Sequence, residues 1–170
     1  MASEVTSPSA FWDVIAKART SNDPTAPSAS PEALGAVLCQ LPSGDVLFFA
    51  QEYRRKLVEL NRWPLWGAGY VIAGGMSDDG FHYFRSWILG KGPEVFGISL
   101  TDPDALGPYV DDPEVENETL EYVATKELEK RDVALPELDS ASPDDEPQGE
   151  PFDEDSVYED FPRLAAQFSE

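Results

Sequence analysis

A pair of glycines inside an aromatic stretch constrains the fold of this chain most strongly. The stretch covers residues 63–90 and holds three of the four tryptophans and the only histidine of the sequence. Gly74 and Gly75 end a helical pattern, because glycine readily adopts the left-handed conformation that closes a helix. Ser77 then caps a second helix, and Asp78 and Asp79 add negative charge where the helix dipole favours it. We therefore expect two antiparallel helices, a central αα-hairpin, joined by about three residues.

Helical spacing continues on both sides of this turn. Trp63-Pro64 predicts the start of the first helix, since proline suits a first turn, and Trp66 and Tyr70 follow at helical spacing. The second helix has an apolar face that we expect in the core, formed by Phe81, Phe84 and Ile88 with Trp87 at its border.

The whole chain is predicted to be all-α, a compact multi-helix domain around this hairpin. Caps, prolines and apolar periodicity predict the other helices over residues 11–19, 31–41, 43–60, 94–100, 114–131 and 152–168, the last started or kinked by Pro162. The domain organisation follows from composition: a disordered N-terminus at 1–9, a helical core at 10–135, an acidic proline-rich linker at 136–151, and a C-terminal helical segment at 152–170 that docks on the core.

Charge is distributed unevenly along the chain, whose net charge is −21. Residues 93–170 carry 24 acidic and 4 basic side chains, whereas residues 51–92 carry 4 acidic and 6 basic ones. Direct binding to nucleic acid is not expected, because the chain lacks a concentrated basic patch for phosphates. A basic protein partner, or folding of the acidic C-terminal part over the arginines of 51–92, is electrostatically easier.

From the sequence we expect neither a membrane span nor a secretory signal. No apolar run approaches the length of roughly 18 residues that a spanning helix needs, and the start has no basic-then-apolar signal pattern. The single cysteine, Cys39, lies in an apolar run where we expect a buried thiol. These features favour a cytoplasmic protein.

The second helix carries a polar stripe that is the first candidate for chemistry. Asp78, His82 and Arg85 lie within a narrow angle on one face. An acid, an imidazole and a guanidinium there can bind an anion or polarise a ligand. The alternative is that Asp78 serves the helix dipole while the other two side chains are solvated or paired along the helix. Asp78 and Asp79 are a poor acid–base pair, because adjacent helical residues point about 100° apart.

Metal and cofactor sites are not predicted. One histidine and one cysteine do not supply a zinc site, and residues 153–155 lack the other ligands and the glycine of a calcium loop. The glycines at 67–69 and 74–75 do not form a phosphate loop, because no strand precedes them and no lysine follows.

Several motifs stand out when they are taken together: Trp63-x-x-Trp66, GGMSDDGFxxFRxW at 74–87, Phe11-Trp12, FDED at 152–155 and FPRL at 161–164. They resemble those of a bacterial family, domain of unknown function DUF4240, common in actinobacteria. The resemblance covers roughly residues 10–168. Some members resemble MolR-like, molybdate-metabolism-regulator proteins that carry a WGR domain, which is absent from this chain, so no nucleic-acid role is carried over. The resemblance implies no particular activity.

Three functional hypotheses remain open. The first is a binding or accessory module that takes a small polar ligand or a peptide in a groove lined by aromatic and charged side chains. The second is an enzyme that uses His82 as general acid or base with Asp78 orienting it. The third is an acidic interaction or inhibitory protein that binds a basic partner through residues 102–160. The candidate groove residues are Trp63, Trp66, Tyr70, Ser77, Asp78, Asp79, His82, Arg85 and Trp87.

Overall fold

The computed structural model describes residues 8–19, 23, 25–136 and 141–168. Within them the backbone forms α-helices, three 3₁₀ helices and a single isolated parallel bridge between Arg62 and Gln148, which confirms the predicted all-α class. The α-helices are α1 (Pro8–Lys17), α2 (Pro31–Leu38), α3 (Ser43–Glu59), α4 (Trp63–Ala73), α5 (Asp78–Lys91), α6 (Pro93–Thr101), α7 (Tyr122–Lys130), α8 (Val157–Asp160) and α9 (Pro162–Phe168). The 3₁₀ helices are η1 (Pro103–Ala105), η2 (Gly107–Tyr109) and η3 (Glu118–Glu121).

Helix α5 is the element around which the others pack. It contacts α1, α3, α4, α6 and η3, and every residue from Phe84 to Lys91 is buried. A helix covered on all sides needs apolar residues around its whole circumference, which the run of Phe, Trp, Ile and Leu supplies. The polar residues within this run, among them Arg85, therefore need partners inside the protein.

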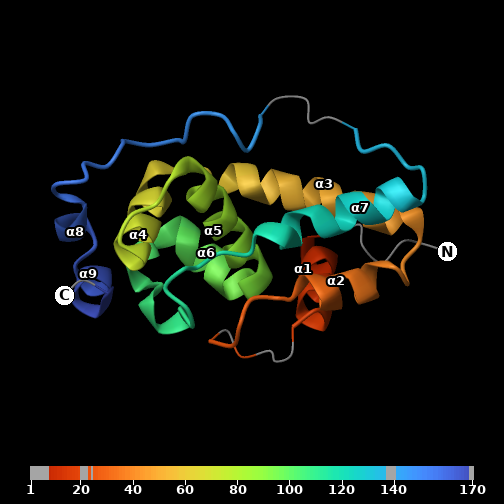
Figure 1. Ribbon diagram of the computed structural model, residues 1–170, viewed down its shortest axis with the longest axis horizontal. Coiled ribbons are helices and arrows are strands. Elements are labelled where there is room, and N and C mark those ends of the chain that lie inside the picture. The colour runs from red at the N-terminus through yellow and green to blue at the C-terminus, as the bar shows by residue number, and fades with distance from the viewer. Residues whose placement is uncertain (1–7, 20–22, 24, 137–140, 169–170) are drawn as a thin grey trace.

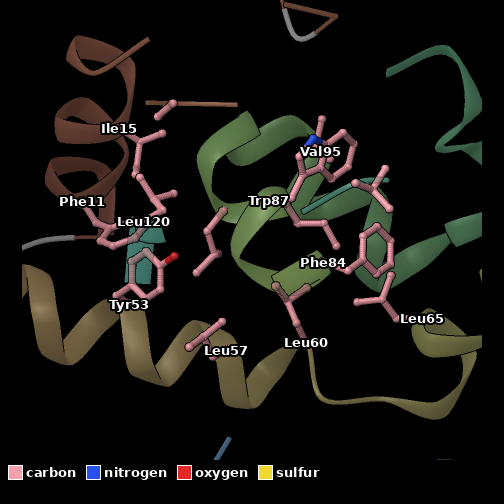
Figure 2. Close-up of a cluster of buried hydrophobic side chains, with 14 of the residues drawn as sticks. Phe11, Ile15, Tyr53, Leu57, Leu60, Leu65, Phe84, Trp87, Val95 and Leu120 are labelled. Carbon is pink, nitrogen blue, oxygen red and sulfur yellow. The ribbon is translucent and has the colours of Figure 1, made fainter. Parts of the chain in front are cut away.

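The core joins helices that are distant in sequence. Figure 2 shows Leu57 of α3 and Leu60, just after its end, on the side that faces Phe84 and Trp87 of α5. Phe81, Phe84 and Ile88 are all buried, which confirms the expected core face of α5.

The predicted turn between α4 and α5 is present. Gly74 adopts the left-handed conformation with φ 73° at the end of α4. The Ser77 hydroxyl accepts a hydrogen bond from the Gly80 amide at 3.1 Å and so caps α5. The two helices are in contact, and the turn sets the first residues of α5 beside the start of α4, where Trp63 and Trp66 lie.

The glycines within α4 allow two close approaches. A Cβ atom on Gly67 would lie 2.9 Å from the Phe161 ring, and one on Gly69 would lie 2.7 Å from the Phe84 ring and the Met76 sulfur. Helix α4 therefore packs against α8 and α9 on one side and against α5 on the other. This packing, rather than a phosphate loop, explains the Gly-Ala-Gly sequence.

The C-terminal part crosses the molecule before it docks. In Figure 1 the blue trace that follows α7 runs along the side of α3 toward α8 and α9, at the far end of the long axis. Helix α9 packs against α4, η1 and η2, and Gln167 donates a hydrogen bond to the Gly107 carbonyl at 3.0 Å. Segments 1–7, 137–140 and 169–170, parts of the predicted terminus, linker and C-terminal segment, lie outside the described residues.

Three local expectations differ from the structure. The helix predicted over 114–131 begins only at η3, because Val115 has a positive φ of 41° and the Asn117 amide bonds to the Tyr83 carbonyl instead of a helical partner. The last predicted helix is two short ones, separated at Phe161 just before Pro162. Cys39 is exposed rather than buried, because α2 ends one residue before it.

Candidate functional site

A cleft of about 620 Å³ opens where the starts of α4 and α5 meet η3, α7 and the C-terminal segment. Its aromatic and core-side lining consists of Asn61, Trp63, Trp66, Phe81, Tyr83, Arg85 and Tyr122. Its remaining lining consists of Asp78, Asp79, His82, Glu121, Pro143, Asp144, Asp145, Glu146 and Pro147. The cleft therefore combines stacked rings with six carboxylates.

One wall of the cleft is a column of stacked aromatic rings. Trp63 stacks on Trp66 with ring centroids 5.1 Å apart, and Trp66 stacks on Phe81 at 4.8 Å. The guanidinium carbon of Arg85 lies 4.6 Å from the centroid of the Phe81 ring. The Trp66 indole N–H donates to the Met76 carbonyl at 3.0 Å, which fixes the ring to the turn between α4 and α5. Helical spacing in α4 and the tight turn thus build a rigid wall.

Arg85 is buried, with 3% of its surface exposed, and its guanidinium donates hydrogen bonds to main-chain carbonyls. Its Nη1 donates to the Leu57 carbonyl at 2.9 Å, and its Nη2 donates to the Pro143 carbonyl at 3.0 Å. Burial lowers the pKa of Arg85 to about 10, although Asp144 and Glu121 act in the opposite direction. The guanidinium holds α3, α5 and the C-terminal segment together, so it is not free to bind an anion in the cleft.

His82 contacts a carboxylate from another element. Its Nε2 pairs with Glu121 of η3, and its Nδ1 lies 3.3 Å from Nη2 of Arg85 and 3.8 Å from a carboxylate oxygen of Asp144. Glu121 therefore takes the orienting position that the sequence suggested for Asp78. The contact with Glu121 is an ion pair only when the imidazole is protonated.

Carboxylates from three separate segments give the cleft a negative potential. Asp78 and Asp79 come from α5, Glu121 from η3, and the remaining three from the C-terminal segment. Their effect is felt at Tyr122, whose phenol pKa is raised by Glu121, by burial, and by further acids that include Asp79 and Asp144. Arg85 and His82 are the basic side chains that line the cleft.

The structure brings together six of the nine predicted groove residues. Those that line the cleft are Trp63, Trp66, Asp78, Asp79, His82 and Arg85. Tyr70 instead faces Phe152, with ring centroids 5.5 Å apart, and Ser77 is engaged in capping α5. Trp87 is 3% exposed and lines a different hollow of about 240 Å³ beside residues 27–31.

Sequence reasoning missed the residues that come from elsewhere in the chain. The sequence places Glu121 within the helix predicted over 114–131 and residues 143–147 within the predicted linker, and it gives no functional signal at Asn61. A weak signal existed for the linker, since prolines at 143 and 147 bracket three acids, a pattern that keeps a segment extended. Nothing in the sequence indicates which core groups such a segment contacts.

Neither a cluster of metal ligands nor a membrane-spanning helix occurs in the described part of the chain. Among residues 8–19, 23, 25–136 and 141–168, no three histidine, cysteine or acidic side chains converge as metal ligands. None of the helices in this described part is long and apolar enough to cross a membrane.

The fold and the cleft together define an all-helical domain with an aromatic, carboxylate-lined cleft. The chain belongs to the family described as "Protein of unknown function (DUF4240)", whose profile matches residues 7–130. This confirms the family resemblance, but the match ends before the acidic and Phe-Pro motifs at 152–164, and the relation to MolR-like proteins stays a prediction. Searches of curated proteins and of solved structures gave no match.

Proposed function

We propose that this protein is a binding module that takes a positively charged group, such as a lysine side chain or an organic amine, in the cleft between the ring column and the carboxylates. The observation that carries the proposal is the convergence of six carboxylates around a cleft whose arginine is already engaged by main-chain carbonyls. A cation entering the cleft gains attraction from several acids at once, whereas an anion meets repulsion.

The aromatic wall supports the same ligand class. Trp63 and Trp66 line the cleft and are only partly buried. Indole rings attract cations by about 0.5–2 kcal/mol, depending on how far the pair is removed from water. A ligand with an ammonium or guanidinium group can therefore contact ring faces and carboxylates together. This restricts the expected ligands to cations, whereas the sequence indicates any small polar molecule or peptide.

Two lysine derivatives that differ only in charge test this proposal. Nα-acetyl-lysine methylamide carries the cation, and its Nε-acetylated form does not. We expect the first to change the tryptophan fluorescence in a saturable way and the second to have no effect, because only the first can pair with Asp78, Asp79 and Glu121. Raising the salt concentration should weaken the binding, since partly exposed charges are screened.

A matched pair of variants localises the interaction. The double variant Asp78→Asn/Asp79→Asn removes two charges from the cleft rim, and we expect about tenfold weaker binding, equivalent to roughly 1.4 kcal/mol. Glu129→Gln removes an exposed acid of α7 that does not line the cleft, and we expect unchanged affinity. Equal effects of the two variants, or equal binding of both lysine derivatives, would refute a specific cation site.

A catalytic role for His82 is the second candidate, and its contact with Glu121 supports it. A carboxylate that orients an imidazole is a common arrangement for general acid–base catalysis. Turnover of p-nitrophenyl acetate or p-nitrophenyl phosphate that disappears in a folded His82→Gln variant would favour this role. Turnover that survives the substitution would exclude His82 as the catalytic base.

A further inference from the structure

Residues 142–149, called the strap here, are bound to the core through their main chain. Arg85 donates to the Pro143 carbonyl at 3.0 Å, and the Asn61 amide group donates to the Asp145 carbonyl at 2.7 Å. The Gln148 amide donates to the Asn61 carbonyl at 2.9 Å, and the Trp63 amide donates to the Gln148 carbonyl at 2.8 Å. Four hydrogen bonds therefore hold the main chain of a short segment in the manner of a docked peptide.

The strap offers the core few side chains to recognise. Pro143 is buried, whereas Asp144, Asp145 and Glu146 are exposed, and the Asp144 side chain is 87% exposed. The Asp145 carboxylate accepts a hydrogen bond from the Ser142 amide at 2.9 Å, which is a contact within the strap and not with the core. A groove that binds the backbone and one proline therefore recognises few side chains between the prolines. The match to the family ends at residue 130, so the groove lies in the family domain and its occupant lies beyond it.

Acidic side chains of the strap are repelled by the acids of the cleft in which the strap lies. Its three acids enter a cleft that already contains Asp78, Asp79 and Glu121, and like charges in one cleft repel. Asp144 is the strap acid with basic groups close by: Nδ1 of His82 lies 3.8 Å from its carboxylate, and its charge attracts the buried Arg85 guanidinium, whose pKa it raises against the lowering effect of burial. The repulsion therefore falls mainly on Asp145 and Glu146. A segment with the same backbone but basic side chains would keep the main-chain hydrogen bonds and replace repulsion with attraction.

Displacement of the strap would also open a longer trough. A second hollow of about 260 Å³ lies on the other side of the strap, between α3, α7 and Leu135. The two hollows share His82, Glu121, Pro143 and Asp144 as lining residues, so Pro143 and Asp144 form the partition between them. In addition, Nε of Arg85 is buried without an acceptor in the described part of the chain. A ligand that replaces the strap can supply that acceptor.

The first residues of the strap form a turn, closed by the Asp145 amide donating to the Ser142 carbonyl at 3.1 Å. We propose that the groove under the strap is the docking site for a proline-containing basic segment of a partner protein that makes the same turn, and that the strap is an intramolecular competitor for it. This inference rests on the proposed function, because the same carboxylates attract the basic side chains. Arg85, Asn61 and the Trp63 amide bind the main chain of the partner. A proline occupies the place of Pro143, and lysine or arginine side chains face the acids of the core.

Three synthetic peptides test the inference on the protein of 170 residues. The second of them, ASPDDEPQGE, is the strap with one flanking residue at each end, residues 141–150. The first, ASPKKKPQGE, has its three central acids replaced by lysine, and the third, ASAKKKAQGE, also has alanine at both prolines. We expect the first to bind, the second to bind at least tenfold more weakly because of its charge, and the third to lose affinity through its prolines. Equal binding of the first and third peptides would leave only a charge effect and would overturn the docking model.

Hydrogen exchange at Gln148 shows whether the strap is displaced. Its amide is bonded to Asn61 in the closed protein, so the basic peptide should increase its exchange rate, whereas Nα-acetyl-lysine methylamide should not. Binding of the lysine derivative without binding of the peptide, or peptide binding with unchanged exchange at Gln148, would overturn this inference and leave the proposed function intact. Absence of binding by both probes would overturn both.

A strap variant provides an independent check. Glu146→Gln removes repulsive charge from the competitor without altering its main chain or the contacts of Asp144 with His82 and Arg85, so the strap should hold more tightly and the basic peptide should bind more weakly than to the natural sequence. Glu129→Gln is again the control, with unchanged affinity expected. Stronger peptide binding to the strap variant would contradict competition by the strap.

Discussion

The indole of Trp66 lies flat against the ring of Phe81, with centroids 4.8 Å apart and planes inclined by 9°. Because Arg85 also lies over the Phe81 ring, this single phenyl group joins the aromatic wall of the cleft to the buried guanidinium that holds the strap. The shape of the cleft and the position of the strap therefore depend on one side chain that contacts both.

The first prediction concerns this ring. Phe81→Leu keeps an apolar side chain but removes the ring face, and we expect the free energy of unfolding to fall by about 1–3 kcal/mol, since an aromatic pair contributes ~0.5–1.5 kcal/mol and a desolvated cation–π contact up to ~2 kcal/mol. Urea denaturation measures the loss. The control is Phe48→Leu, because Phe48 is only partly buried and has no ring partner in the described part of the chain, and its loss should be smaller.

A double-mutant cycle checks that the contact itself is responsible. Combining Phe81→Leu with Arg85→Met should cost less than the sum of the two single losses, because both remove the same interaction. Strict additivity would show that the two residues stabilise the fold independently, and the link between the wall and the strap would then be absent.

The second prediction concerns the close approach of α4 to the C-terminal segment. Gly67→Ala places a methyl group 2.9 Å from the Phe161 ring and 3.3 Å from Val157. We expect a net loss of about 1–2 kcal/mol in the free energy of unfolding, because overpacking by ~1–3 kcal/mol exceeds the helix-propensity gain of up to ~1 kcal/mol. Hydrogen exchange in α8 and α9 should increase, since these helices must move away.

Gly97 supplies the matched control for this substitution. It lies within α6, and a Cβ atom there would meet nothing within 4 Å. Gly97→Ala should therefore stabilise the protein by about 0.5–1 kcal/mol through the unfolded-state entropy and helix propensity of alanine. Similar stabilisation by both substitutions would show that the C-terminal helices do not depend on close contact with α4.

Local signals predict most of the helices and six of the sixteen residues that line the cleft, and distant contacts supply the rest. The turn at Gly74, the cap at Ser77 and the apolar face of α5 follow from glycine conformation, capping and periodicity, which depend only on near neighbours. The same rules place Asp78 and His82 on one face of a helix, and both line the cleft, but these rules cannot pair His82 with Glu121, 39 residues further along. Trp87 lies outside the cleft, contrary to the prediction, because helical periodicity does not show that this part of α5 is covered on every side.

The burial of Arg85 is the clearest example of what the sequence conceals. On a helical wheel it shares a face with Asp78 and His82, which is compatible with binding an anion, with polarising a ligand, or with a solvated or paired stripe. Its environment is decided by the carbonyls of Leu57 and Pro143, which come from segments 28 and 58 residues away. A lone arginine among apolar residues in the sequence is compatible with either outcome, and only tertiary packing distinguishes them.

The last prediction concerns the acid dependence of the C-terminal docking. Asp104 of η1 accepts hydrogen bonds from the Leu164 amide at 3.0 Å and from the Arg163 amide and Nε at 3.3 and 3.1 Å. Burial raises the pKa of Asp104, but the hydrogen bonds from Leu164 and Arg163 together lower it by more than burial raises it. The pKa therefore lies below the ordinary value of 3.8. The folded protein thus favours the ionised carboxylate.

The sign of the pH effect follows from linkage. A carboxyl group whose pKa is lower in the folded than in the unfolded protein contributes stability that is complete above the unfolded value and is lost as the pH falls through the folded value. The docking of α9 should therefore be unaffected above the ordinary value of 3.8 and should weaken below it. The NMR shift of the Leu164 amide measures this, because its hydrogen bond to Asp104 breaks when the carboxyl group is protonated.

Substitution of Asp104 separates this effect from general acid unfolding. In Asp104→Asn the hydrogen bond to the Leu164 amide should be weak at every pH, and docking should be less favourable by about 1 kcal/mol, as for the loss of a helix cap. The Leu164 amide shift should then show no carboxyl titration at residue 104. Asp160→Asn removes an exposed acid of α8 close in sequence to the docked helix and should leave the transition at Leu164 unchanged. A transition that persists in Asp104→Asn and disappears in Asp160→Asn would assign the acid sensitivity to α8 and remove Asp104 as the group that controls docking.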